Sequence, residues 1–251
     1  MSREYILRRF IRMIFTLWVI MTIIFFMFRL IPADPASLLI DSSLTAEGQQ
    51  QLREFWGIDK PVFTQYLTYM GNLLKLDFGR SFFYRVPVME VLGPFLRNSL
   101  VLMVPAVVLA IVAAIGIGSY MGWKRGSIIE RWGIMIPLVL HGVPLYWLGL
   151  VALIIFSFWL RWFPSSGMRE LGYTAETVWD IYFNIDFLRH LILPMMTAAI
   201  YLAASPIMLM RSSMIEVQNE EFLDVIRAKG VPERVVVRHA MRNALLPVVT
   251  Y

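Results

Sequence analysis

Uncharged hydrophobic runs alternate with charged intervals along this chain. Four such runs occupy 13–28, 98–123, 132–160 and 190–210. A helix needs about 20 apolar residues to cross a hydrocarbon core roughly 30 Å thick. The first run reaches this length past Arg29, whose long side chain can extend to the lipid headgroups. The pattern therefore predicts four transmembrane helices.

Glycines and prolines modify this picture inside the runs. The second run contains Gly116, Gly118 and Gly122, which predict close approach of another helix. The third and fourth runs each contain two prolines, which predict kinked helices whose freed carbonyls are satisfied by neighbours. These prolines are Pro137, Pro144, Pro194 and Pro206.

The interval 32–97 is polar to mixed in character. It contains two helical patterns, over 52–56 and 61–74, and both are too short to span a bilayer. We expect them to form a small lid on the outer surface. A signal peptide is the alternative interpretation of the first run, because four arginines precede it. No small-x-small cleavage site follows the run, so we favour a transmembrane helix.

A polar interval, 220–247, separates the fourth run from an apolar segment at the end of the sequence. Its periodicity predicts two short helices around Gly230, a residue typical of left-handed helix ends. Pro232 suits the first turn of the second helix. The predicted faces comprise Phe222, Val225, Ile226 and Lys229 on the first helix and Val235, Val236, His239, Ala240 and Asn243 on the second. Two interpretations stay open here, a docking element for another protein and an amphipathic loop lying on lipid headgroups.

Composition supports a membrane protein. The 251 residues are 58% hydrophobic and 16% charged, whereas soluble domains carry about 25% charged residues. The absence of cysteine excludes disulfides and thiolate metal sites. The net charge of +5 comes from residues that flank the runs, which argues against nucleic-acid binding.

Flanking charge predicts the orientation. The N-terminal tail carries four arginines, and the interval 124–131 has three basic residues against Glu130. The interval 161–189 has three arginines against four acidic residues. The positive-inside rule therefore places the N-terminus and the interval 220–247 in the cytoplasm.

Residues that could carry catalysis do not form a recognisable set. No nucleophile elbow, zinc-protease motif or phosphate-binding loop occurs in the sequence. His141, His190 and His239 lie in different segments without a carboxylate at ligand spacing, so we predict no metal site. A multi-spanning membrane enzyme, such as an intramembrane hydrolase, is the alternative function and would need a paired nucleophile and base. A passive channel would need rings of pore-lining charge, which the uncharged runs lack.

Short motifs add a family resemblance. Arg-Ala-Lys-Gly at 227–230, followed by His-Ala and by Asn-Ala-Leu-Leu-Pro, resembles the coupling loop of permease subunits of ABC importers. In the wider superfamily a Glu-Ala-Ala triplet stands six residues before the glycine, and here Asp224, Val225 and Ile226 occupy those positions. Further matches indicate the dipeptide/oligopeptide branch. They include Pro-Ala-Asp-Pro-Ala at 32–36, Asp-Phe-Gly-Arg-Ser at 77–81, Arg131, 142–150, 162–167 and 190–194.

The resemblance implies a fold. It is all-α, a polytopic transmembrane helical bundle of the type I ABC importer kind. The family has six spans, so we expect four complete spans and the start of a fifth, with the sequence truncated at its C-terminus. We expect residues 1–95 to hold the first transmembrane helix and the outer segment, and residues 96–251 to form the ABC importer transmembrane domain.

The resemblance also implies a function. We expect a permease subunit of an ATP-driven importer for peptides or related small solutes, multi-pass in a prokaryotic plasma membrane. Its expected partners are a homologous second permease, two ATPase subunits or domains inside, and a substrate-binding protein outside. The chain itself is expected to be no enzyme and to bind no cofactor, because ATP and Mg²⁺ are used by the partner ATPase.

The same resemblance assigns the interval 220–247 to coupling with the ATPase. The residues expected to carry this role are Glu221, Phe222, Asp224, Val225, Ile226, Arg227, Ala228, Lys229, Gly230, Arg238, His239, Asn243 and Pro247. No catalytic or metal-binding residue is expected, and the sequence does not indicate which residues line the substrate pathway.

Overall fold

The computed structural model describes residues 3–30, 60–81, 83–84, 86–170, 172–173 and 177–250. Within these ranges the regular structure is helical, apart from an isolated bridge between Arg80 and Pro87. The all-α class is therefore confirmed. The chain divides into two compact units, Met1–Phe95 and Leu96–Tyr251.

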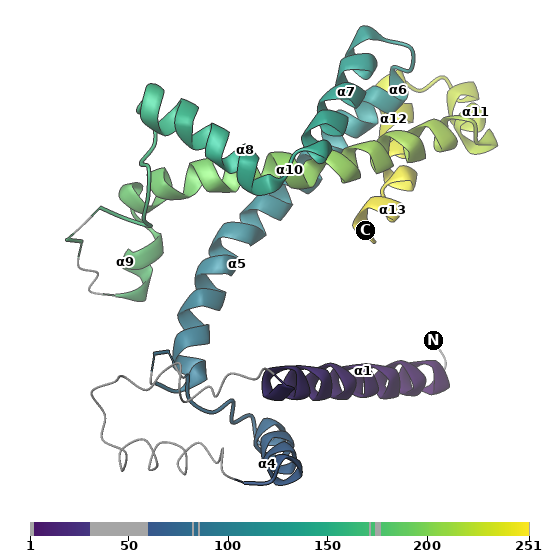
Figure 1. Cartoon of the computed structure of the whole chain (residues 1–251). Coiled ribbons are helices and arrows are strands. Elements are labelled where there is room, and N and C mark those ends of the chain that lie inside the picture. The colour runs from purple at the N-terminus through teal and green to yellow at the C-terminus, as the bar shows by residue number, and fades with distance from the viewer. Residues whose placement is uncertain are drawn as a thin grey trace. The chain divides into compact units, whose positions relative to one another are not determined.

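The first unit contains two described helices, α1 (Arg3–Leu30) and α4 (Val62–Leu74), and the start of α5 (Figure 1). α1 is the first predicted span, present as one continuous helix. α4 corresponds to the predicted pattern over 61–74, whereas the pattern over 52–56 lies outside the described residues.

Aromatic side chains hold α4 against α1. The hydroxyl groups of Thr22 and Tyr66 are hydrogen-bonded at 2.8 Å. The ring of Phe25 lies 5.4 Å from that of Tyr66 and 5.5 Å from that of Tyr69, centroid to centroid. Such tilted and edge-on ring pairs are favourable arrangements for aromatic side chains. Most other side chains of α1 are exposed.

The second unit is arranged around α10, a continuous helix of 34 residues (Figure 1). Asn184 caps its start by accepting the Phe187 N–H at 2.6 Å, which satisfies a free donor of the first turn. The helices of this unit are α5 (Val88–Ala113), η1 (Ala114–Gly118), α6 (Ser119–Trp123), α7 (Ile128–Gly142), α8 (Leu145–Ala152), η2 (Leu153–Trp159), α9 (Val178–Tyr182), α10 (Ile185–Gln218), α11 (Glu221–Ala228), α12 (Glu233–Ala244) and α13 (Leu246–Val249). α5 leads through the π-helical η1 into α6, and all the others except α11 pack on α10 or continue a helix that does.

The closest packing joins the η1–α6 segment to α10. A Cβ atom placed on Gly118 would lie 2.7 Å from the Ile207 carbonyl oxygen. A Cβ on Gly122 would lie 2.6 Å from the Met214 Cβ. Small residues allow such backbone approach where helices meet in a membrane. The predicted close contact is confirmed for these two glycines, whereas Gly116 faces open space.

The third predicted span is not one straight helix. It is divided into α7 and α8, whose axes are bent by 103° across a break of a few residues. Val143 is extended, with φ −103° and ψ 131°, and precedes Pro144, which disfavours helical geometry in the residue before it. Pro137 lies inside α7 without ending it. The predicted kink of the third run is therefore present at Pro144, and it is a complete break between two helices, whereas Pro137 does not interrupt α7.

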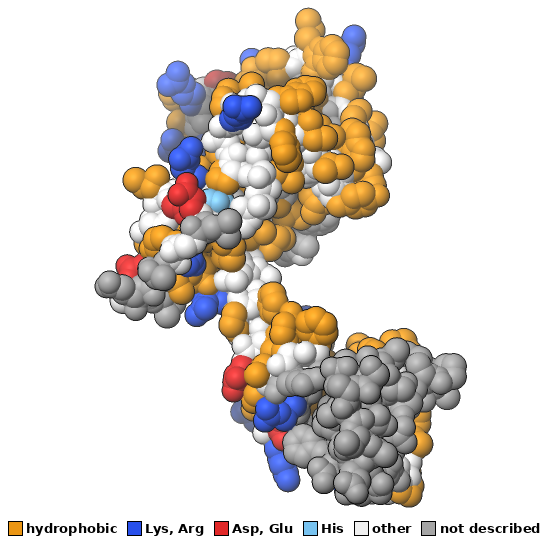
Figure 2. All heavy atoms as spheres, turned by 60° about the vertical axis from the view of Figure 1, so that its left-hand side comes forward, with side chains coloured by type: hydrophobic (Ala, Val, Ile, Leu, Met, Phe, Trp, Pro, Cys, Tyr) orange, Lys and Arg blue, Asp and Glu red, His pale blue; other side chains and the backbone are white. Residues whose placement is uncertain are grey.

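The lengths and compositions of the described helices fit a membrane protein. Three helices are long and apolar enough to cross a bilayer, and the bent pair brings the total to four if it counts as one span. Large hydrophobic side chains cover much of the face shown in Figure 2. Tyr146, Trp159 and Leu138 are among the most exposed. A lipid environment accounts for apolar exposure on this scale.

Candidate functional site: the helical hairpin around Gly230

The interval 220–247 folds as the predicted pair of helices, α11 and α12. Gly230 between them has φ +71°, so the predicted left-handed glycine is confirmed. Its N–H donates to the Arg227 carbonyl oxygen at 2.9 Å. Pro232 directly precedes α12 and lies outside its first turn. We call residues 220–244 the hairpin.

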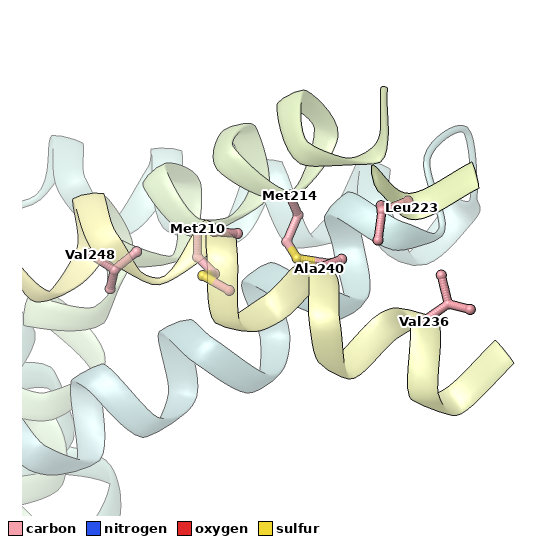
Figure 3. Packing of buried hydrophobic residues seen from close by; sticks show 7 residues of the cluster. Met210, Met214, Leu223, Val236, Ala240 and Val248 are labelled. Carbon is pink, nitrogen blue, oxygen red and sulfur yellow. The ribbon is translucent and has the colours of Figure 1, made fainter. Parts of the chain in front are cut away.

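A buried cluster fixes the hairpin to the end of α10. Figure 3 shows its side chains gathered between the C-terminal part of α10, α11, α12 and α13. The cluster consists of Met210, Met214, Leu223, Val236, Ala240, Ala244 and Val248. Full burial of such side chains stabilises by about 1.5–3 kcal/mol for each large residue. The hairpin is therefore a packed part of the second unit.

The buried faces differ in part from the predicted ones. On α11, Leu223 is fully buried, whereas Val225 is 58% exposed. Phe222 and Ile226 are half-buried against the cluster. The cause is the position of Met210 and Met214, which meet α11 on the side of Leu223 and leave Val225 facing outward.

The second helix shows a similar shift. Of the predicted face, Val236 and Ala240 are buried inside the permease, whereas His239 and Asn243 are exposed. Asn243 Nδ2 donates to the His239 carbonyl oxygen at 2.9 Å, a bond within the helix. The inward face continues to Ala244 instead.

The outward face of the hairpin is polar and carries exposed charges of both signs, five basic and four acidic. Arg227 is partly engaged, because it pairs with Asp224 at 3.0 Å and lies 5.8 Å from the centroid of the Trp123 ring. The predicted site residues on this exposed side are Glu221, Asp224, Val225, Arg227, Ala228, Lys229, Gly230, Arg238, His239, Asn243 and Pro247. Arg234 and Arg242, which were not predicted as site residues, are also exposed.

Sequence comparison places this architecture in a known family. Residues 114–251 match the family described as binding-protein-dependent transport system inner membrane component. Residues 1–92 match the N-terminal region of binding-protein-dependent transport system membrane components. The chain belongs to this family of permease subunits. It is thus a multi-pass inner membrane protein and not an enzyme, as predicted.

Relatives of the permease are named for peptide transport. The permease is 33% identical to the oligopeptide transport system permease protein AppB of Bacillus subtilis (strain 168), with 98% of the permease and 76% of AppB covered. It is 34% identical to the di/tripeptide transport system permease protein DppB of Pseudomonas aeruginosa (strain UCBPP-PA14), covering 98% and 77%. It is 30% identical to the glutathione transport system permease protein GsiC of Salmonella paratyphi A (strain ATCC 9150 / SARB42), covering 98% and 76%. These matches place the permease among peptide ABC importers.

An ion pair at the base of the hairpin was not predicted. Glu130, at the start of α7, accepts Arg211 Nε from α10 at 2.8 Å and also accepts the Gly126 N–H. Ser127 caps the same turn by accepting the Glu130 N–H at 3.1 Å. Ser127-x-x-Glu130 has the spacing of a capping box. This spacing was the one signal in the sequence that could have drawn attention to Glu130 at the start of α7.

At the other end of α10, polar contacts tie α9 to α5. Arg97 Nε donates to the Tyr182 hydroxyl at 2.7 Å, and that hydroxyl donates to Asn98 Oδ1 at 2.6 Å. A cavity of about 930 Å³ lies beside them, and its described lining is apolar apart from Arg97, Tyr182 and Asn184. In the described part of the permease, no group of three or more His, Asp or Glu side chains is placed to hold a metal ion.

Proposed function

We propose that the permease is the transmembrane subunit of an ATP-driven importer for short peptides or related small solutes. The hairpin docks on an ATPase subunit, and ATP-driven motion of that subunit switches the transmembrane helices between inward-facing and outward-facing states. A homologous permease, a second ATPase and an external binding protein complete the assembly. ATP and Mg²⁺ are used by the ATPases.

The cargo class rests on the relatives. Oligopeptides, di/tripeptides and glutathione appear in the names of proteins that match the permease over 98% of its length. Glutathione is itself a modified tripeptide, so the three names share short peptides as a chemical class.

One observation favours a protein partner over a lipid surface for the hairpin. An interfacial amphipathic helix buries its apolar face in the headgroup region. Here the apolar side chains of Leu223 and Val236 are buried inside the permease, where they pack in one cluster with Met210 and Met214. The outward face offers charged groups and the exposed Val225, which suits a polar protein surface with an apolar pocket better than it suits a bilayer.

The orientation follows from the flanking charge. We propose that the N-terminus and the hairpin are cytoplasmic, where the ATPases are located. Residues 1–95 then carry the first span and the outer segment, and residues 96–251 form the transmembrane domain that the hairpin drives.

Gly230→Val tests the docking role. A Cβ at Gly230 would meet no atom within 4 Å, so only the positive φ opposes a side chain. Valine adopts this conformation with strain, whereas asparagine tolerates it. We expect Gly230→Val to insert at normal abundance, to co-purify weakly with the ATPases and to lose substrate-stimulated ATP hydrolysis.

Two control variants sharpen this test. Gly230→Asn should retain ATPase binding. Gly149→Val should also retain it, because Gly149 faces open space without a positive φ. If Gly230→Val binds the ATPases and transports normally, the docking role of the hairpin is wrong.

Arg234→Glu separates the protein partner from the lipid surface. Arg234 is exposed and lies on the outward face of α12. If the hairpin rested on anionic lipid, the charge reversal would loosen it from vesicles without affecting ATPase assembly. We expect the opposite: weaker co-purification of the ATPases, and unchanged association of the hairpin with the bilayer surface when the permease is reconstituted in anionic vesicles.

A further inference from the structure

Three contacts join residues 122–130, from the end of α6 to the start of α7, to residues 211–227, from the end of α10 into α11. Glu130 of α7 pairs with Arg211 of α10. Gln218 Nε2, at the end of α10, donates to the Gly122 carbonyl oxygen of α6 at 3.1 Å. The third contact is the stacking of Arg227 of α11 over the ring of Trp123. All three cross between the same two segments.

The ion pair is the strongest of these contacts. Glu130 is 6% exposed, and both of its carboxylate oxygens accept N–H groups, one from Gly126 and the other from Arg211. Charge-assisted hydrogen bonds of this kind are roughly twice as strong as neutral ones. Loss of either partner would leave a buried charge uncompensated, so the pair resists separation.

Backbone packing restrains sliding at the same place. A Cβ on Gly122 would lie 2.8 Å from the Arg211 carbonyl oxygen, so α6 and α10 touch through their main chains. Met121 and Met214 are fully buried beside this contact. The two segments therefore have both directional bonds and a close-packed surface between them.

We propose that these segments form one rigid block, which we call the corner block: α6, the turn 124–127, the first turn of α7, the C-terminal part of α10 and α11. Glu130 and Arg211 act as positioning residues within it. A push on α11 then moves three transmembrane elements together, α5–α6, α7 and α10. α7 carries this motion beyond the block as far as its bend with α8. This inference rests on the proposed docking of the hairpin.

Spin-label distances in the full assembly test the rigidity of the corner block. The chain has no cysteine, so labels attach only at introduced positions. Arg125→Cys and Glu216→Cys, both exposed, report the distance across the block. We expect the distribution of distances between these two labels to be the same with and without ATP and Mg²⁺. The reference pair, Glu216→Cys with Trp159→Cys beyond the bend, should shift with nucleotide.

Two outcomes of the labelling experiment would overturn the proposal. A nucleotide-dependent shift within the 125–216 pair would show that the block comes apart during the cycle. A reference distance that also stays constant would show that the block is not a distinct unit of motion. An undocked hairpin would also give a constant reference distance, so the second outcome counts against the corner block only where the labelled permease still co-purifies with the ATPases.

Glu130→Gln tests the positioning role. We expect ATPase co-purification and basal ATP hydrolysis to be retained, while substrate imported per ATP hydrolysed falls by about five- to tenfold. In the same variant, the distribution of distances between the labels at positions 125 and 216 should broaden. Glu90→Gln, an exposed glutamate in the first turn of α5, is the matched control and should leave the import ratio unchanged.

A double-variant comparison separates pairing from general stability. If the two residues act through each other, Glu130→Gln combined with Arg211→Gln should lower the import ratio no further than either single variant. Additive losses would contradict the pairing. Loss of ATPase binding in Glu130→Gln would show instead that the pair supports docking itself. Gly230→Val tests docking independently, so failure of the hairpin and failure of the corner block are distinguishable.

Discussion

The Gly122 contact with α10 allows a quantitative prediction for Gly122→Ala. The added Cβ would lie 2.6 Å from the Met214 Cβ and 2.8 Å from the Arg211 carbonyl oxygen. Ordinary contact begins at 3.4 Å, so α6 and α10 must separate by about 0.8 Å. A gap of this size forfeits a quarter to a half of the dispersion energy of each atom pair along the contact. We expect a loss of about 1–3 kcal/mol in the free energy of unfolding.

Gly116→Ala is the matched control for this prediction. Gly116 lies in η1, just before Gly118, and a Cβ there meets no atom within 4 Å. Alanine is the better helix former, so this variant should be unchanged or more stable by about 0.5–1 kcal/mol. The measurement is unfolding of the purified permease by sodium dodecyl sulfate in mixed micelles, followed by fluorescence of its eight tryptophans.

Combining substitutions refines the prediction further. A Cβ on Gly118 would lie 2.7 Å from both the Ile207 carbonyl oxygen and the Met210 Cβ. One outward movement of the segment relieves the clashes at Gly118 and Gly122 together. The double alanine variant should therefore lose less than the sum of the two single losses. The reasoning is refuted if Gly122→Ala is as stable as the wild type, or if Gly116→Ala is equally destabilised.

Two further predictions concern orientation and helix capping. If the hairpin is cytoplasmic, an impermeant maleimide added outside cells should label Ser42→Cys but not Ser212→Cys. The reverse labelling pattern would show that the topology is inverted. Ser212 is chosen because it is exposed, whereas its neighbour Ser213 is buried. Asn184→Ala removes the side chain that accepts the Phe187 N–H at the start of α10. We expect this variant to lower the free energy of unfolding by about 1 kcal/mol in the same micelle assay. An unchanged free energy of unfolding would show that another group caps α10.

The helices and the conformation of Gly230 were predictable from sequence because both depend on local requirements. A membrane helix must be apolar over a continuous length, so composition alone located α1 and α10. Glycine at a helix end relieves the steric cost of a positive φ, so its place between two helical patterns indicated the turn. These signals need no knowledge of neighbouring helices.

The buried face of the hairpin was only partly predictable because it depends on a partner. Periodicity defines a broad stripe on a short helix, but the edge that is buried is set by what packs against it. The side chains of Met210 and Met214 meet α11 at Leu223 and leave Val225 outside. Neither methionine position could be inferred from the pattern of α11 itself.

The ion pair between Glu130 and Arg211 was missed for a related reason. The two residues are 81 positions apart, and the charge of Glu130 was counted only against its basic neighbours in the interval 124–131. A count of flanking charges treats each group as exposed to solvent. The structure shows that this carboxylate is buried and bonded across to another helix, a fact that only the packing of α7 on α10 reveals.

The contacts at the two ends of α10 favour one of the two ways in which the bent pair can be counted. Near the start of α10, the Tyr182 hydroxyl bonds to Asn98 at the start of the second apolar run. Near its end, Gln218 bonds to Gly122 at the end of that run. The α5–α6 segment and α10 therefore run in the same direction, and both are long and apolar enough to span a bilayer. Two parallel spans can be joined only by a connection that crosses back. If the α7–α8 pair is this connection, four described segments are long and apolar enough to cross a bilayer.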